Sequence, residues 1–288
     1  MSDPAVTLPP PPGLDVELAG RVLPEFVRQE CNRFGIERGV VGVSGGIDSA
    51  LTLEIAVRGL GAENVRAIHM PHRTSSAEST ELARLTAEHA GVPLEIVDVT
   101  PMADAFFAAA GGLDDLDDPA VRTRRGNVMA RCRMIVLYDV SAEFRALVIG
   151  TSNKTEALFG YATLFGDMAY AMSPIGDLYK TQVYLLARHY GVPEPVLDVP
   201  PSADLWPGQT DEGELGMTYA VADALLHRMV DRRYSRAELL RLGFPAELLD
   251  RAERMIRHTQ YKRRPALFAK LANRTVNLDW RYPRDWGT

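Results

Sequence analysis

A short run at residues 44–49, Ser-Gly-Gly-Ile-Asp-Ser, combines residue types that can hold a polyphosphate. It follows the apolar stretch 39–43 and leads into a second apolar stretch, so we expect it at the corner between a strand and a helix. The two glycines allow backbone conformations that a Cβ would hinder, and the free amides at a helix start attract phosphate groups. The residues expected to bind the polyphosphate, with two serine hydroxyls as further donors, are Ser44, Gly45, Gly46, Ile47, Asp48 and Ser49.

Asp48 is the unusual member of this run. A carboxylate among phosphate-binding groups would repel the ligand unless a cation lay between them, and this predicts bound Mg²⁺. The run lacks the Gly-Lys-Ser/Thr ending of a Walker A loop and the third glycine of a dinucleotide fingerprint. A glycine-rich turn with a capping aspartate is the alternative interpretation. The run resembles the pyrophosphate loop of the N-type ATP pyrophosphatases, which cleave ATP to AMP and pyrophosphate while adenylating a second substrate.

The elements that must position this corner alternate between β-rich runs and helical patterns. The expected strands are 39–43, 64–70, 93–99 and 145–150, and the expected helices among them include 75–91 and 127–144. This alternation favours an α/β fold, a doubly wound parallel sheet with flanking helices, which binds ligands beyond the carboxyl ends of its strands. Further helices are expected at 180–191, 218–230, 235–243 and 245–260. We expect one domain over 1–288, with 1–16 as a loose proline-rich lead-in.

Composition narrows the class of protein. The 288 residues carry a formal charge of -6, which argues against a general nucleic-acid binder. No apolar run reaches membrane-spanning length, and the N-terminal stretch lacks the order of a signal peptide. Cys31 and Cys132 are far apart, so neither a disulfide framework nor a zinc site is indicated. We expect a cytoplasmic protein without nucleic-acid or membrane partners.

Four further motifs give the sequence a more specific resemblance. They are "MPHRTSSAES" at 70–79, "GNVMARCRM" at 126–134, the stretch 150–219 that begins "GTSNKTEALFG", and "YKRRP" at 261–265. From about residue 20 onward the chain resembles the NAD⁺ synthetases. The resemblance implies amidation of deamido-NAD (nicotinic acid adenine dinucleotide) to NAD⁺ with ATP and ammonia, through an acyl-adenylate, releasing AMP and pyrophosphate. It also implies a homodimer that binds deamido-NAD near the subunit interface.

The nucleotide half of the expected site depends on residues far apart in the sequence. Glu156 follows a predicted strand and can reach the crevice of Asp48, although a glutamate at a helix start also suits the helix dipole. The resemblance makes Glu156 the second Mg²⁺ ligand beside Asp48. It implies ATP contacts for Thr151, Lys180 and Ser202, with Lys180 stabilising the pyrophosphate leaving group. Without the resemblance, Lys180 would pass for a surface lysine.

The part of the expected site that binds deamido-NAD follows from the resemblance more than from the residue types. Asp167 matches an aspartate beside the reacting carboxyl group, where it would bind ammonium or take a proton from it. The residues implied to contact deamido-NAD are Asn127, Arg131, Asp167, Tyr261 and Lys262. The neighbouring Arg124 and Arg125 fit a solvated loop. Many bacterial relatives have a lysine where this chain has Leu164 and an aspartate where it has Ala171, which leaves the deamido-NAD contacts open.

Free ammonia is the expected nitrogen donor. Glutamine-dependent relatives carry an additional amidase domain with a catalytic cysteine, whereas Cys31 and Cys132 are expected to be structural. A glutaminase on a separate chain and another amidating or adenylating enzyme of the ATP pyrophosphatase type remain as alternatives. A nucleotide-binding module without catalysis is disfavoured, because it has no need of two metal-site carboxylates and a third carboxylate at the acceptor.

Overall fold

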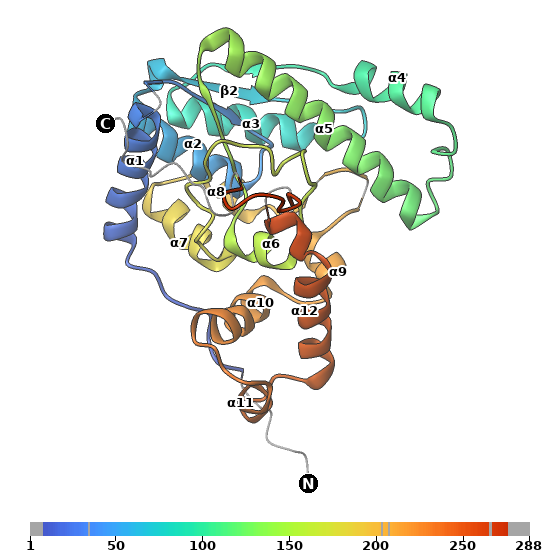
Figure 1. Cartoon of the computed structure of the whole chain (residues 1–288). Helices are drawn as coiled ribbons and strands as arrows, with labels where there is room; N and C mark the ends of the chain where they lie inside the picture. The colour runs from blue at the N-terminus through green and yellow to red at the C-terminus, as the bar shows by residue number, and fades with distance from the viewer. Residues whose placement is uncertain (1–7, 34, 203, 207, 265–266, 276–288) are drawn as a thin grey trace.

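A parallel sheet with the strand order β3-β2-β1-β4 organises the chain. The computed structural model describes residues 8–33, 35–202, 204–206, 208–264 and 267–275. The strands are β1 (Gly39–Gly42), β2 (Val65–His69), β3 (Leu94–Ile96) and β4 (Leu147–Ile149), with helices on both faces (Figure 1). The predicted doubly wound α/β fold is therefore confirmed.

The central strand β1 explains the burial of the sheet and the place of the site. Val41 packs into the core on one face and Val40 into the core on the other, and both are completely buried. Gly39 pairs with Val65 of β2 on one side and with Leu147 of β4 on the other. The chain thus leaves β1 towards β2 and β3 and later returns to its other side as β4. This reversal is the point at which open α/β sheets bind ligands.

Two hydrophobic cores, one on each face of the sheet, lie between the sheet and its helices. The first core contains side chains of α1 (Val16–Arg33), α2 (Ile47–Leu60), α3 (Ala77–Ala90), α7 (Lys180–His189) and α8 (Glu194–Asp198). The second contains side chains of α4 (Thr100–Ala110) and α5 (Pro119–Phe144). A 3₁₀ turn, η1 (Ala62–Asn64), joins α2 to β2. Because α1, α3 and α7 all pack against α2, the helix that begins at the glycine corner is firmly held.

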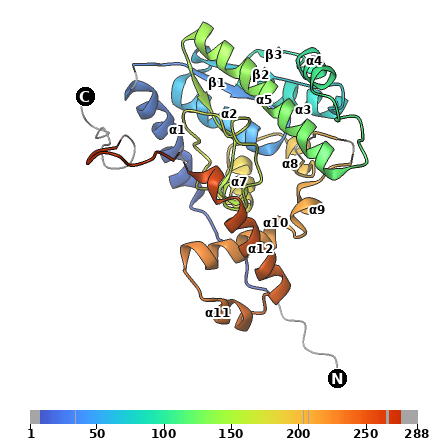
Figure 2. The same cartoon turned by 45° about the vertical axis from the view of Figure 1, so that its right-hand side comes forward.

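A third core joins the C-terminal helices below the sheet layers (Figure 2). It contains side chains of α6 (Lys154–Phe159), α9 (Asp211–Leu215), α10 (Tyr219–Leu226), the π-helical η2 (His227–Asp231), α11 (Arg236–Arg241) and α12 (Ala246–His258). A last 3₁₀ turn, η3 (Gln260–Arg263), follows α12. The organisation of the whole chain as one domain stays a prediction.

Helix α5 begins earlier than its periodicity predicted. It was expected over 127–144 but begins at Pro119, because Asp118 caps it by accepting the Ala120 amide at 2.8 Å. Arg124 and Arg125 therefore lie on a helix, and their expected place in a solvated loop is wrong. Their guanidinium groups donate to the carbonyl oxygens of Gly112 at 3.1 Å and Leu113 at 2.9 Å, and so fix the segment that precedes the helix.

Other parts of the structure differ less. The strand expected over 93–99 is limited to β3, an edge strand on which Glu95 and Ile96 are exposed. Cys31 and Cys132 are buried and free, which agrees with structural roles. Within the described ranges, no helix combines the length and the apolar character needed to cross a bilayer.

Candidate active site

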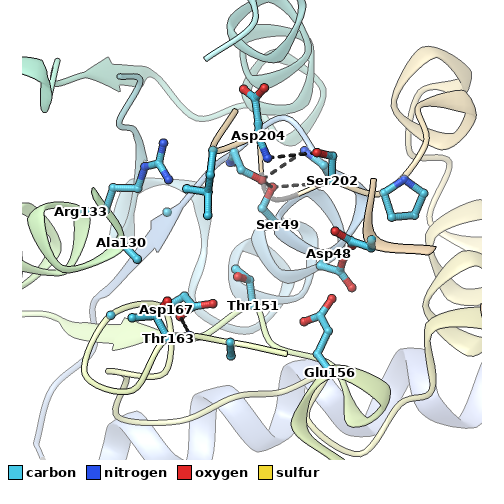
Figure 3. A pocket seen from close by; sticks show the side chains of 18 of the residues that line it. Asp48, Ser49, Ala130, Arg133, Thr151, Glu156, Thr163, Asp167, Ser202 and Asp204 are labelled. Atoms are coloured by element: carbon cyan, nitrogen blue, oxygen red, sulfur yellow. Dashed lines mark hydrogen bonds between the residues drawn. The ribbon is translucent and has the colours of Figure 1, made fainter. Parts of the chain in front are cut away.

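A cavity of about 690 Å³ lies at the switch point of the sheet. Its walls include the residues that follow β1, β2 and β4, together with the starts of α2, α6 and α7. Every site residue predicted from the sequence lines it except Arg131, and all of these residues lie in the described part of the chain. Figure 3 shows labelled side chains on opposite sides of the cavity, with Ser202 and Asp204 at the top of the view and Thr163, Asp167 and Glu156 below.

The corner at 44–49 forms the wall beside α2. Gly45 has a φ of +92°, and a Cβ there would lie 2.4 Å from the Ser79 carbonyl oxygen, so the position requires glycine. The Ser44 amide donates to Ser49 Oγ at 3.2 Å, and Ser49 Oγ donates to the Gly46 carbonyl at 2.8 Å. These bonds fix the corner and leave the start of α2 at the cavity wall, where its amides can meet an anion.

Asp48 and Glu156 point towards one another in the cavity (Figure 3). Asn153 Nδ2 donates to Asp48 Oδ1 at 2.9 Å and to Glu156 Oε1 at 2.7 Å. Lys180 Nζ forms an ion pair with Asp48 and lies 3.7 Å from Glu156 Oε1. Sequence reasoning missed Asn153, although it forms a capping box with Glu156 at the start of α6, and an Asn followed three residues later by Glu is a readable signal.

Charge and burial decide what this cluster can hold. Burial raises the pKa of Glu156, and the nearby charge of Asp48 raises it further. Burial opposes the charged form of Lys180, but Asp48 and Glu156 outweigh it and raise the Lys180 pKa. Two carboxylates beside one ammonium suit an additional hard cation such as Mg²⁺. Asp48 and Glu156 offer carboxylate oxygens to such a cation, and the rest of its coordination sphere would come from phosphate oxygens and water.

A further carboxylate, Asp211, lines the same cavity and was not predicted. It is buried and accepts hydrogen bonds from Tyr161 Oη at 3.1 Å and Tyr219 Oη at 2.9 Å. Burial raises the pKa of Asp211, and the charge of Lys180 acts in the opposite direction. Thr210 caps α9 directly before it, so a capping pattern marks the helix in the sequence, whereas the two tyrosine partners come from other elements.

Asp167 lies in another part of the cavity wall, away from Asp48 and Glu156 in Figure 3. Its Oδ1 accepts the Thr163 amide at 2.6 Å, and Thr163 Oγ1 donates to Asn127 Oδ1 at 2.8 Å. The Asp167 side chain is open to the cavity, yet the protein around it removes enough water to raise its pKa. A carboxyl group of this kind can exchange a proton closer to neutral pH than an ordinary aspartate.

The turn after α12, η3, packs against the loop that leads from α6 to Asp167. Lys262 Nζ donates to the carbonyl oxygens of Gly160 at 2.8 Å and Ala162 at 2.6 Å, and burial lowers the Lys262 pKa. Tyr261 also lines the cavity but is 61% exposed. Residues 261 and 262 are therefore part of the cavity wall, and Lys262 is attached to the loop at 160–162.

Arg131 and Arg133, two of the arginines of α5, face different surroundings. Arg133 lines the cavity beside Ala130 (Figure 3) and donates from Nε to the Met70 carbonyl at 3.0 Å, and burial lowers its pKa. Arg131 is exposed outside the cavity and donates from Nε and Nη2 to the Leu164 carbonyl at 3.3 and 3.2 Å. Its contact with deamido-NAD stays a prediction. Arg133 was missed, although it shares helical spacing with Asn127 and Ala130.

The remaining predicted residues lie between these groups. Thr151 follows β4 and lines the cavity near its middle in Figure 3. Ser202 lines it from the chain that precedes α9, and its Oγ accepts the Asp204 amide at 3.1 Å. Asp204 Oδ2 in turn accepts the amide of Ser76, the N-cap residue of α3, at 3.0 Å. This segment therefore closes over the start of α3.

Comparisons with known proteins agree with this geometry. Residues 20–266 match the family model described as NAD synthase. The chain is 51% identical over 272 residues to the NH(3)-dependent NAD(+) synthetase of Chlorobaculum tepidum, covering 94% of this chain and 96% of that one. The structure resembles NMN synthetase from Francisella tularensis, with a TM-score of 0.78 and 29% identity over 89% of this chain and 99% of that one.

A second solved structure gives the same result. The NH3-dependent NAD synthetase from Campylobacter jejuni, determined in complex with nitrate, has a TM-score of 0.74 and 29% identity, covering 89% of this chain and all (100%) of that one. Sequence, fold and cavity agree over nearly the same span. The chain therefore belongs to the NAD synthase family.

Proposed function

We propose that this chain is an ammonia-dependent NAD⁺ synthetase that amidates deamido-NAD and converts ATP to AMP and pyrophosphate. The proposal depends on one observation above all: the glycine corner, the Asp48, Glu156 and Lys180 cluster, and Asp167 share one cavity. An anion site, a cation site and a proton acceptor are the three functions that this reaction needs. The relative from Chlorobaculum tepidum, named as NH(3)-dependent, supports ammonia as the nitrogen donor.

The phosphates of ATP are proposed to bind at the start of α2. The amides of 44–49 and the hydroxyls of Ser44 and Ser49 donate to them, and Thr151 and Ser202 complete the contacts. Lys180 neutralises charge on the pyrophosphate as it leaves. Asp48 and Glu156 would hold Mg²⁺, which when bound offsets the negative charge of the triphosphate.

The reaction then has two steps. A carboxylate oxygen of the nicotinate group attacks the α-phosphorus of ATP, and pyrophosphate leaves to give an acyl-adenylate. Ammonia attacks the activated carbonyl carbon, the new C–N bond replaces the C–O bond to AMP, and the surplus proton passes to Asp167. The raised pKa of Asp167, which follows from desolvation by the surrounding protein, suits this proton transfer.

Deamido-NAD is proposed to contact Asn127, Asp167, Tyr261 and Lys262, which share one part of the cavity wall. We add Arg133, because it lines the cavity and offers a cation to the dinucleotide phosphates. Arg131 lies outside the cavity, so its proposed contact depends on a homodimer that brings the substrate to the subunit boundary. The proposed setting is the cytoplasm, with free ammonia as the nitrogen source.

The test is a balanced assay of the purified protein. ATP, Mg²⁺, ammonium and deamido-NAD are expected to give NAD⁺, AMP and pyrophosphate in equal amounts. Because the Francisella relative is described as an NMN synthetase, nicotinic acid mononucleotide is assayed in parallel, with a lower kcat/KM expected. Formation of ADP, or no turnover with either acceptor, would contradict the proposal. Faster turnover of the mononucleotide would change the substrate.

A further inference from the structure

Asp223 is a fully buried carboxylate on α10 that lies outside the cavity wall described above. Its Oδ1 accepts Thr155 Oγ1 at 2.6 Å, and its Oδ2 accepts the Thr181 amide at 2.7 Å. Thr155 Oγ1 also accepts the amide of Lys180 at 3.0 Å. One side chain of α10 therefore contacts the first turn of α6 and the first turn of α7 at once.

These contacts adjoin two of the titratable side chains of the site, Glu156 and Lys180. Thr155 directly precedes Glu156 on α6, and Thr181 directly follows Lys180 on α7. The amides of Lys180 and Thr181 lie in the first turn of α7, where no carbonyl of the helix itself can accept them. Asp223 and Thr155 supply acceptors for both. The relative position of the two helix starts is thus fixed from a third helix.

Asp231 makes a second contact between the same elements and offers a comparison. Its Oδ1 accepts Lys154 Nζ of α6 at 2.9 Å, and its Oδ2 accepts Oη of Tyr179, the N-cap residue of α7, at 3.1 Å. These bonds involve long side chains and lie nearer the solvent. They join α6 to α7 without touching the Lys180 amide or the residue that precedes Glu156.

We propose that Asp223 is a positioning residue that holds Glu156 and Lys180 at the separation needed to bind metal-bound ATP. The inference rests on the proposed function for its kinetic consequences but on the hydrogen bonds alone for its structural ones. Loss of the shared acceptor frees the first turns of α6 and α7 to separate. The binding of ATP together with Mg²⁺ then weakens, while contacts with the other substrate remain.

Four variants of the full chain test this. Asp223→Asn replaces one acceptor by an amide donor, and Thr155→Val removes the shared hydroxyl while keeping the side-chain shape. Thr155→Ser keeps the hydroxyl, and Asp231→Asn is the matched control on the other contact. Calorimetry measures the ATP Kd with and without Mg²⁺ for each variant, steady-state kinetics give kcat and both KM values, and thermal unfolding gives Tm.

For Asp223→Asn and Thr155→Val we expect the gain in ATP affinity on adding Mg²⁺ to fall about tenfold, and kcat to fall about tenfold or more. The KM for deamido-NAD should stay within about twofold of the parent value. Thr155→Ser should restore parent behaviour, and Asp231→Asn should lower Tm with little change in kcat or in the effect of Mg²⁺. Thr155→Val decides the matter should Asp223→Asn fail to fold.

Parent-like Mg²⁺-dependent ATP affinity in Thr155→Val would overturn the inference, as would an equal loss in Asp231→Asn. Because calorimetry needs no turnover, this result is separate from the fate of the proposed reaction. A parent enzyme that makes no NAD⁺ but shows the expected binding pattern contradicts the proposed function and leaves the positioning role supported.

Discussion

At the scale of single residues, the chemistry depends on charges that the fold has gathered and partly desolvated. Asp48, Glu156 and Lys180 come from three helix starts, and Asn153 bridges the two carboxylates. Burial makes an unpaired charge costly, and the ion pair between Lys180 and Asp48 offsets part of that cost. When Glu156 is also ionised, the group has more negative than positive charge and suits a cation that arrives with the substrate.

The variant Glu156→Gln should lower the activity without lowering the stability of the fold. Burial raises the Glu156 pKa, so the folded protein favours the protonated carboxyl, and the ionised form destabilises it above that pKa. The variant should therefore unfold at the same Tm as the parent or higher near pH 8, and this difference should shrink as the pH falls through the raised pKa. Its rate of AMP formation should fall about 100-fold, because a ligand for the metal is lost. A lower Tm at pH 8 with a normal rate would contradict both expectations.

Asp167→Asn should affect the second step alone. An amide cannot accept the proton that ammonia releases, and general base catalysis contributes about 100-fold or more. Rapid-quench measurement should show a normal first release of pyrophosphate, followed by NAD⁺ formation slowed about 100-fold. A variant that loses the pyrophosphate burst instead would place Asp167 in the adenylation step.

At the scale of elements, the glycine corner and the starts of α2, α6 and α7 position the side chains of the site. Interactions between residues close in the sequence determine much of this local structure. The corner can be predicted from the sequence because only glycine fits at position 45, and the start of α6 can be predicted from its capping box. The true start of α5 was also present in the sequence, as Asp118 followed by Pro119, but the periodicity of 127–144 obscured it.

Gly45→Ala tests the corner. The change forces an alanine into a φ of +92° with its Cβ 2.4 Å from the Ser79 carbonyl oxygen. We expect a loss of about 1–3 kcal/mol in the free energy of unfolding, measured by urea titration, and a KM for ATP raised about tenfold or more. In Gly46→Ala, the matched change, φ is -88° and the nearest atom to the new Cβ is Ser44 Oγ at 3.4 Å. An equal stability loss in both variants would show that backbone strain at Gly45 is not the cause.

At the scale of the whole molecule, sequence patterns predicted the sheet but not the contacts that cross it. The strands and the ligand-binding edge follow from local periodicity and the rules of α/β topology. Asp211 and Asp223 escaped notice because their hydroxyl and amide partners come from other elements, and only the assembled fold brings these together. The resemblance implied Arg131 as the substrate contact, whereas only the assembled structure shows that Arg133, two residues further along the same helix, lines the cavity.

The outer face of α5 is the surface that we expect to form the proposed homodimer. Ile135 and Tyr138 on α5 are 52% and 43% exposed and lie at helical spacing from Arg131 on the outer face. Ile135→Asp should therefore convert a dimer into a monomer in size-exclusion chromatography with light scattering, and raise the KM for deamido-NAD. Val22→Asp, at a 52% exposed position of α1, is the control and should stay dimeric. A parent protein that is monomeric at micromolar concentration would contradict the homodimer.

The most direct test of the whole proposal is a crystal structure with a non-hydrolysable ATP analogue and Mn²⁺, using anomalous scattering to locate the metal. The triphosphate should lie against residues 44–49, with the anomalous peak between Asp48 and Glu156 and Lys180 directed towards the phosphates. A nucleotide bound elsewhere, or a triphosphate at the corner with no metal beside the two carboxylates, would contradict the central claim.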